Sequence, residues 1–350
     1  MVKREMTEQD VMDEEVKSPK VIALEKDLAE LKRENEKLKR QAGTDEALFE
    51  SIQDGVSGLA LEPYARLPVP ELDGDHDEHQ AAVMISDTHS DEFVRAEEME
   101  GIAEHTWEIH EERMAITADK VLEMTGIMRK SAPVDVLNVW VLGDLFLGEI
   151  HPEETAYGSE MTLPVALPSE ARVLADTVLR MAAGFKQVRV VGLCGNHGRN
   201  SRKPVMKMTA DRNWDYSVYL IAQELTRNAE NVEWVLPKSI MHVEEVLGQK
   251  YLLTHGNVAN VTHRTPYFGI ENSFFSQRNA RRKTDLDFDH VFMGHFHHSF
   301  GLRGFINGVP SMIGANQFSL YRMHCATPAA QELVFLTEKH GPTARWTIEL

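Results

Sequence analysis

The sequence predicts an α/β fold with four layers, in which two β-sheets pack back to back and helices cover the outside. Short apolar runs rich in β-branched and aromatic residues alternate with helical segments, a pattern that is typical of parallel strands joined by helices. Towards the C-terminus the strand-like runs become shorter and turns more frequent, which favours antiparallel pairing there. The 350 residues are sufficient for one large domain with appendages.

An N-terminal helix is predicted first, because residues 21–42 carry an unbroken heptad repeat. Its a and d positions are Val21, Leu24, Leu28, Leu31, Asn35, Leu38 and Ala42. The g and following e positions pair Asp27 with Lys32 and Glu34 with Lys39, and an Asn at a buried a position is best satisfied in a parallel pair of helices. We therefore expect residues 1–45 to form a parallel coiled coil in a homodimer. The alternative is a single amphipathic helix that packs on its own domain.

Deletion of residues 1–45 should convert a dimer into a monomer or a weaker dimer, because the whole heptad seam is removed. Light scattering would measure the change in mass. An unchanged mass would show that the dimer interface lies elsewhere.

Residues 46–80 are predicted to be a linker, since they include three prolines and an acidic stretch, and residues 81–350 form the main domain. Central strands are expected at 84–85, 139–142, 188–191, 251–253 and 291–293, with further strands at 232–235 and 240–246. Helices are expected at about 96–130, from Ser169 as N-cap to about 184, and at 214–226.

Each of the five central strands is followed by side chains that commonly bind metal ions. These residues are Asp87, His89, Asp144, Asn196, His255, His295 and His297. Ligands at the ends of neighbouring strands converge on one edge of a sheet, so the ordered set predicts a dinuclear metal site. Any one of these residues, taken alone, could be a turn residue or a buried core histidine.

Charge and cysteine content narrow the possible functions. A net charge of −18 argues against non-specific coating of nucleic acid, which depends on many Lys and Arg contacts. Two cysteines, Cys194 and Cys325, suggest neither a disulfide framework nor a thiolate metal site. The N-terminus is too polar for a signal peptide and no apolar run is long enough to span a membrane, so we expect a cytoplasmic protein.

The ordered motifs Asp-x-His, Gly-Asp, Gly-Asn-His, His and Gly-His-x-His, over residues 81–320, resemble those of the calcineurin-like metallophosphoesterase superfamily. The runs 143–146 (Gly-Asp-Leu-Phe) and 294–297 (Gly-His-Phe-His) are similar to its DNA-repair exonuclease branch. The run 195–199 (Gly-Asn-His-Gly-Arg), with 213–215 (Asn-Trp-Asp), is similar to a group of phage and bacterial metallophosphoesterases. If the chain is phage-encoded, the expected location is the host cytoplasm.

The resemblance implies a ligand assignment and a reaction. Asp87, His89 and His297 would bind one ion, Asn196, His255 and His295 the other, and Asp144 would bridge them. Mixed nitrogen and oxygen ligands suit Mn²⁺ best, with Fe or Zn²⁺ as alternatives. A hydroxide held between the ions would attack phosphorus, and Asp144 and His197 are the expected catalytic residues. His197 would bind the phosphate or protonate the leaving oxygen; Gly198 stands where the family often has an acidic partner for this histidine.

The substrate stays open between alternatives at this point. Basic residues beside the ligand motif, Arg199, Arg202 and Lys203, favour a nuclease-like phosphodiesterase that binds nucleic-acid phosphates. The acidic net charge favours a phosphodiesterase or phosphatase for a small nucleotide or phosphoester. A third reading is a coiled-coil scaffold with a vestigial metal site. A second basic run, Arg278 to Lys283, is also expected near the metal site, unless it is solvated surface charge.

Overall fold

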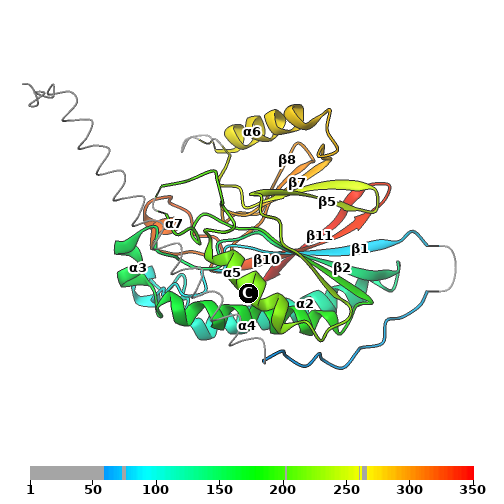
Figure 1. Ribbon diagram of the computed structural model, residues 1–350, viewed down its shortest axis with the longest axis horizontal. Coiled ribbons are helices and arrows are strands. Elements are labelled where there is room, and N and C mark those ends of the chain that lie inside the picture. Colours follow the sequence, from blue (N-terminus) through cyan, green and yellow to red (C-terminus); the bar gives the residue numbers. More distant parts are fainter. Residues whose placement is uncertain (1–58, 73–75, 202, 260, 262–265) are drawn as a thin grey trace, which may run out of the picture. The chain divides into compact units, whose positions relative to one another are not determined.

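The computed structural model describes residues 59–350, apart from 73–75, 202, 260 and 262–265 (Figure 1). The predicted coiled coil therefore lies outside the described residues. The strands are β1 (His79–Ile85), β2 (Val134–Val141), β3 (Gln187–Gly192), β4 (Val232–Val235), β5 (Met241–Val246), β6 (Gln249–Thr254), β7 (His290–Met293), β8 (Phe300–Leu302), β9 (Ile306–Gly308), β10 (Ala330–Thr337) and β11 (Gly341–Glu349). The helices are η1 (Ala96–Met99), α2 (Trp107–Met128), α3 (Pro152–Gly158), α4 (Leu163–Ala182), α5 (Trp214–Leu225), α6 (Pro266–Arg281) and α7 (Gln317–Tyr321).

The strands form two sheets, as predicted. The six-stranded sheet has the order β11-β10-β1-β2-β3-β4, and its strands β1 to β4 are parallel. The five-stranded sheet has the order β5-β6-β7-β9-β8, with β6, β7 and β9 parallel. Because parallel strands end at the same edge, the loops after β1, β2 and β3 meet one another, and so do those after β6 and β7.

The two sheets pack face to face through a shared hydrophobic core. Trp140 of the six-stranded sheet contacts Tyr251 and Phe292 of the other, with ring centroids 5.5 and 5.2 Å apart. All three are buried, and aromatic rings of this size contribute strongly to a core. This core fixes the relative position of the two sets of loops that carry the predicted ligands.

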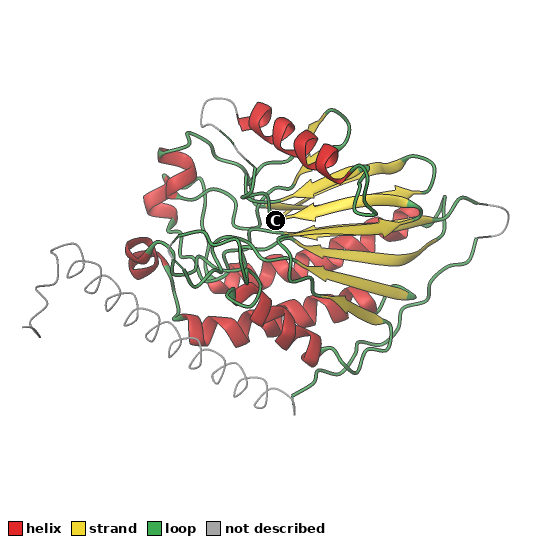
Figure 2. Ribbon diagram, turned by 45° about the horizontal axis from the view of Figure 1, so that its top comes forward, coloured by secondary structure: helices red, strands yellow, loops and turns green. Residues whose placement is uncertain are grey.

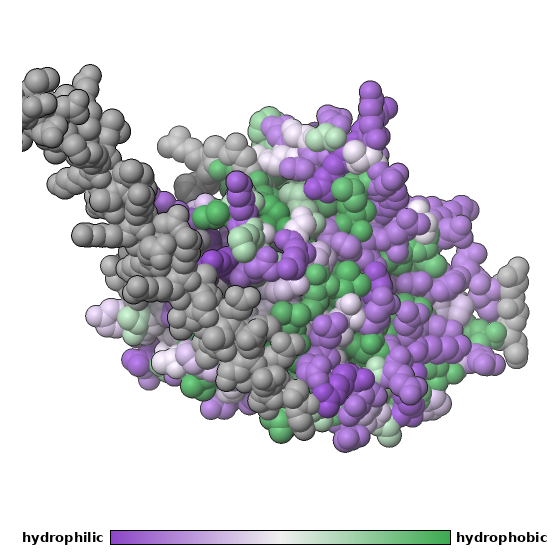
Figure 3. Space-filling view, in the orientation of Figure 1, coloured by the Kyte–Doolittle hydropathy of each residue, from purple (hydrophilic) through white to green (hydrophobic). Residues whose placement is uncertain are grey.

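Helices cover the outer faces of both sheets (Figure 2). On the six-stranded sheet, α4 packs between α2 and α5. On the five-stranded sheet, Ile270 and Phe274 of α6 lie in a core with Phe288, Val291 and Phe305. The surface view in Figure 3 shows hydrophilic side chains with hydrophobic ones interspersed, as is usual for folded proteins. The arrangement agrees with the predicted order of helix, sheet, sheet and helix.

Two helix predictions need correction. The segment 96–130 is not one helix, because Glu100 and Gly101 adopt positive φ values of 55° and 77° and end η1. Thr106 then caps α2 by accepting a hydrogen bond from the Ile109 amide. Ser169 is not an N-cap: α4 begins at Leu163, and the Ser169 hydroxyl donates to the Val165 carbonyl inside the helix.

Among the described residues, no helix is both long enough and apolar enough to cross a membrane.

Candidate metal centre

The predicted ligands follow β1, β2, β3, β6 and β7, and their backbones are unusual. Asp87, His89, Asp144, His295 and His297 all have positive φ, between 41° and 69°. Such left-handed backbone is uncommon for residues other than glycine, and strained residues of this kind cluster at functional sites. The loops therefore hold these five side chains in positions that ordinary turns would not give them.

Asp87, His89 and His297 form the first group. Each offers one ligand atom, and these atoms lie within 4.8 Å of one another. His297 Nε2 is 3.3 Å from Asp87 Oδ1. Both ring nitrogens of His89 are buried without a hydrogen-bond partner. Buried polar atoms are normally paired, so an imidazole left unpaired in this position fits a cation.

Asp144, His255 and His295 form the second group, again with ligand atoms within 4.8 Å. His255 Nε2 lies 2.8 Å from Asp144 Oδ2 and 3.2 Å from Asn196 Oδ1, so the asparagine joins this group. The other ring nitrogen, Nδ1, lies 2.9 Å from the Leu142 carbonyl, to which it donates. A backbone acceptor on one nitrogen leaves the other for a metal, as is usual for metal-binding histidines.

The protonation of the two groups also fits cations. Burial, followed by the charge of His197, lowers the pKa of His89 to about 3; burial and His255 lower the pKa of His295 to about 3. Both imidazoles are therefore neutral, as ligands must be. Burial opposes ionisation of Asp144, but His255 and His197 outweigh it and hold the pKa well below its usual range.

His297 and His255 are the exceptions. Burial lowers the pKa of each, but a neighbouring carboxylate outweighs it: Asp87 raises the pKa of His297 above its usual value, and Asp144 raises that of His255 to about 9. Without a cation, the proton on His255 balances the carboxylate charge. A divalent ion would take over that role and release the proton.

The two groups are adjacent. The His295 amide donates to both carboxylate oxygens of Asp87, at 3.1 and 3.0 Å, and so links the second group to the first. The charge of Asp144 also acts to raise the pKa values of Asp87 and His89, so Asp144 lies close to the first group as well. Carboxylate, imidazole and amide oxygen ligands without thiolate are suited to divalent ions such as Mn²⁺ or Zn²⁺.

His197 lies beside these groups, with its ring centroid 4.8 Å from that of His89. Its Nδ1 lies 2.7 Å from the Leu147 carbonyl oxygen, to which it donates. This backbone contact gives the His197 ring a partner other than an acidic side chain, and it involves Nδ1 and not Nε2. An acidic residue could not replace Gly198, because a Cβ there would lie 2.3 Å from Asn213 Oδ1.

Three buried carboxylates near the ligands were missed from sequence. Asp91 accepts from the Leu147 amide at 2.7 Å, and Glu92 Oε2 lies 3.8 Å from His89 Nδ1. Burial raises the pKa of Glu92 to about 7. Asp215 is fully buried next to Asp144. The closeness of Asp91 and Glu92 to the Asp-x-His motif was a usable signal, whereas Asp215 is remote in sequence from the residues it contacts.

The predicted substrate-binding residues have different positions. Arg199 donates from Nη1 to the Asn196 carbonyl at 3.0 Å, which places its guanidinium beside the ligand loop. Lys203 is exposed, and Arg202 lies outside the described residues.

In the second basic run, Arg278 lies over the ring of Phe305, 5.5 Å from its centroid, and Arg281 contacts the Met241 sulfur. These described contacts are with the five-stranded sheet and not with the ligand loops.

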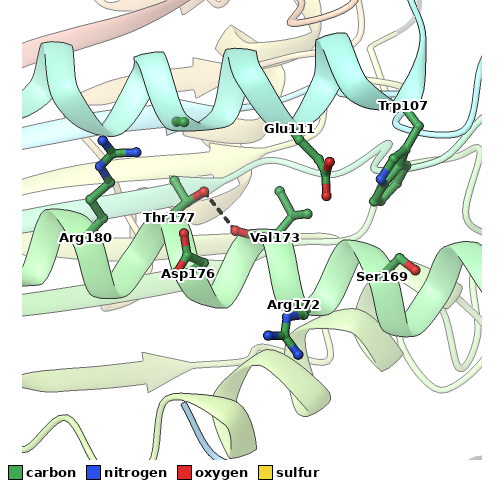
Figure 4. A pocket seen from close by; sticks show the side chains of 9 residues that line it. Trp107, Glu111, Ser169, Arg172, Val173, Asp176, Thr177 and Arg180 are labelled. Carbon is green, nitrogen blue, oxygen red and sulfur yellow. Dashed lines mark hydrogen bonds between the residues drawn. The ribbon is translucent and has the colours of Figure 1, made fainter. Parts of the chain in front are cut away.

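A separate pocket of about 290 Å³ lies between α2 and α4 (Figure 4). Trp107 and Arg180 are among the residues that line it. Arg180 pairs with Asp119 at 3.0 Å, and Asp176 accepts from Tyr64 at 2.8 Å. Its lining includes none of the metal-binding candidates, so this crevice in the helical layer is distinct from the metal centre.

No protein-family model matches the chain, and no curated protein matches it in sequence. Solved structures that are similar include a predicted phosphoesterase from Streptococcus pneumoniae, with 12% identity and a TM-score of 0.31 over 77% of this chain and 98% of that chain. Vacuolar protein sorting 29 from Cryptosporidium parvum has 13% identity and a TM-score of 0.30, over 79% and 100% of the two chains. Vps29 from Entamoeba histolytica complexed with Zn²⁺ has 13% identity and a TM-score of 0.31, over 77% and 99%.

The class of this protein is inferred from its own fold and metal-binding groups. A mixed α/β architecture with two sheets carries two adjacent candidate metal-binding groups at one edge. This combination is consistent with the metallophosphoesterase class that the motifs resemble.

Proposed function

We propose that the protein is a dinuclear metal-dependent phosphoesterase that hydrolyses phosphodiester bonds in nucleic acid. The observation that carries the proposal is the pair of groups, each with three ligand atoms within 4.8 Å, next to a histidine that is not one of the ligands. A structural metal site needs only one closed set of ligands, whereas hydrolysis benefits from two adjacent ions and a nearby proton donor.

The proposed ligands differ in charge. Asp87 and Asp144 supply negative charge, and His89 and His295 supply neutral nitrogen donors. Asn196 supplies an uncharged oxygen, so the ion that it binds would remain a strong Lewis acid. Two divalent ions bound there, for which we propose Mn²⁺, would supply Lewis acidity and a hydrolytic nucleophile. Because the ligand backbones are already strained into position, little reorganisation accompanies the reaction.

His197 acts on the substrate. Its Nδ1 hydrogen bond to Leu147 fixes the ring, so Nε2 is available to bind a phosphate oxygen or to protonate the leaving oxygen. Its ring is nearly perpendicular to that of His89, at an interplanar angle of 84°, and lies next to the first metal group.

Basic side chains on the loop after β3 favour nucleic acid as the substrate. Arg199 lies at the ligand loop and Lys203 is exposed farther along the same loop. A polymer could extend its phosphates from the metal centre to these residues, and a parallel dimer would present two active sites to one strand. The net charge of −18 favours the second candidate, a phosphodiesterase or phosphatase for a small nucleotide or phosphoester.

The test is activity of the purified full chain with added Mn²⁺ on single-stranded DNA, duplex DNA, RNA, cyclic dinucleotides and bis-p-nitrophenyl phosphate. Hydrolysis of a polymer supports the nuclease proposal. Hydrolysis of small substrates alone supports the second candidate. No metal-dependent hydrolysis, in a preparation shown to bind two ions, would contradict both.

Charge reversal at Arg199, Arg202 and Lys203 is expected to raise the KM for an oligonucleotide more than that for a small diester. Since Arg199 also holds the Asn196 loop, Lys203→Glu is the cleanest single change. We expect a rise of about two- to fivefold for the oligonucleotide, as is usual for one exposed charge. The slope of the logarithm of the binding constant against the logarithm of salt concentration should also become less steep, by about 0.7 to 0.9.

Lys339→Glu is the matched control, because Lys339 is an exposed lysine in the turn between β10 and β11. Equal effects of Lys203→Glu on both substrates would place Lys203 in the immediate phosphate pocket and would favour the small-nucleotide function.

A further inference from the structure

Asp215, near the N-terminus of α5, joins the two loops that carry Asp144 and Asn196. Its Oδ2 accepts hydrogen bonds from the amides of Asp144 and Gly195, at 3.0 and 2.8 Å. Its Oδ1 accepts from the Leu145 amide at 3.2 Å. One buried carboxylate therefore binds the loop after β2 and the loop after β3 at the same time.

Asn213, the N-cap of α5, strengthens this connection. Its side-chain oxygen accepts from the Asp215 amide at 2.9 Å, and its side-chain nitrogen donates to the Gly195 carbonyl at 2.8 Å. The Trp214 amide also donates to the Gly198 carbonyl, at 2.7 Å. The start of α5 is thus bonded to both ends of the Gly-Asn-His-Gly turn.

The contact between the two loops is close. A Cβ at Gly143 would lie 2.2 Å from the Gly195 nitrogen, and one at Gly195 would lie 2.0 Å from Asp144 Oδ1. Glycine is required at both positions for the loops to approach this closely. The two loops therefore cannot move closer without a steric clash, and this contact sets the spacing between the Asp144 and Asn196 side chains.

The stability of the fold alone does not explain why residue 215 is an aspartate. Asp215 is fully buried beside the carboxylate of Asp144, and two neighbouring buried negative charges are costly. Helix N-caps and first turns need only one or two acceptors, and Asn213 already caps α5. What Asp215 adds is three hydrogen bonds to the ligand loops.

We infer that Asp215 is a positioning residue that completes the second metal group by fixing Asp144 and Asn196 relative to each other. This inference rests on the proposed function, since it concerns the same metal centre. It also gives a role to the Asn-Trp-Asp run at 213–215, which occupies the space that an acidic side chain at position 198 would need.

The test is metal binding by the full-length chain, measured as Mn²⁺ bound per chain after equilibrium dialysis. The wild type should bind two ions. Asp215→Ala should remain folded but retain one ion, held by Asp87, His89 and His297, because these residues have no bond to Asp215. Electron paramagnetic resonance should accordingly change from the signal of a coupled Mn²⁺ pair to that of an isolated ion.

Asp215→Asn covers the case in which the alanine variant does not fold. The amide oxygen can keep the bonds to Asp144 and Gly195, but the amide nitrogen cannot accept from Leu145. We expect two ions, with the second bound about 10- to 100-fold more weakly, as is usual when a supporting partner of a ligand is lost. Glu244→Gln, which changes a buried carboxylate that pairs with Arg189, is the matched control and should bind two ions normally.

The outcomes separate this inference from the function. Two ions with normal affinity and a coupled signal in both Asp215 variants would overturn the positioning role while leaving the proposed function intact. If both ions were lost in proportion to the loss of folded protein, Asp215 would have a merely structural role. This outcome would also overturn the positioning role. Failure of the wild type to bind two ions would instead contradict the proposed dinuclear function.

Discussion

Replacing Asp144 with alanine is expected to abolish phosphoesterase activity, with a loss of about 10³-fold or more. In typical enzymes, removal of a single group that stabilises charge in the transition state already lowers kcat by about 10²- to 10³-fold. Asp144 would contact both ions, so its loss should have at least this effect. The variant should also bind less metal, because His255 loses its neighbour at 2.8 Å and the His197 amide loses its acceptor at 2.7 Å.

The fold should survive this change. The Asp144 side chain lies in the loop after β2 and outside the hydrophobic core that joins the sheets. Metal content and hydrolysis of bis-p-nitrophenyl phosphate would be measured together with thermal unfolding. Asp119→Ala, at an exposed carboxylate on α2, is the control and should behave as wild type. Full activity in a folded Asp144→Ala variant would remove the dinuclear mechanism.

Much of the fold could be predicted because the relevant signals are local. The apolar runs at 139–142 and 251–253 are short and rich in strand-forming residues, and both end in a polar motif. A strand end places that motif at a sheet edge, and the resemblance to the metallophosphoesterase superfamily implies which residues would meet. In the structure, the ligand atoms of Asp87, His89 and His297 lie within 4.8 Å of one another.

What sequence could not provide depends on contacts between distant residues or on the backbone. Asp215 lies 71 residues from Asp144, and nothing in its local sequence indicates three amide partners. The Leu147 carbonyl that orients His197 is a backbone group, which no residue type reveals. Serine is a favoured N-cap residue, which is why Ser169 predicts a helix start, but α4 begins at Leu163 and continues through Pro168 and Ser169.

The reading of Phe274 and Phe275 shows the same limit. From sequence, this pair could either stack bases or belong to the core. Phe274 is fully buried in the core beneath α6, whereas the Phe275 ring packs on Phe305 at 5.3 Å and stays 40% exposed. Only the packing of α6 on the five-stranded sheet shows that Phe274 belongs to the core.

Replacing His197 with alanine should leave both metal ions bound but lower turnover by about 10²- to 10⁴-fold, the usual range for a positioned proton donor. Metal should be retained because His197 belongs to neither metal-binding group, although its ring lies 4.8 Å from that of His89. Bound Mn²⁺ and kcat would be measured on the same samples. His340→Ala, at an exposed histidine in a turn, is the control.

The leaving group then distinguishes the two roles of His197. A p-nitrophenolate ion leaves without protonation, so a general acid is needed far less for p-nitrophenyl esters than for an alkyl phosphodiester. If Nε2 protonates the leaving oxygen, the loss in His197→Ala should nearly vanish with the p-nitrophenyl substrate. An equal loss with both substrates would assign His197 to phosphate binding. Loss of metal in this variant would contradict both roles, because it would make His197 a support of the ligands through its contact with His89.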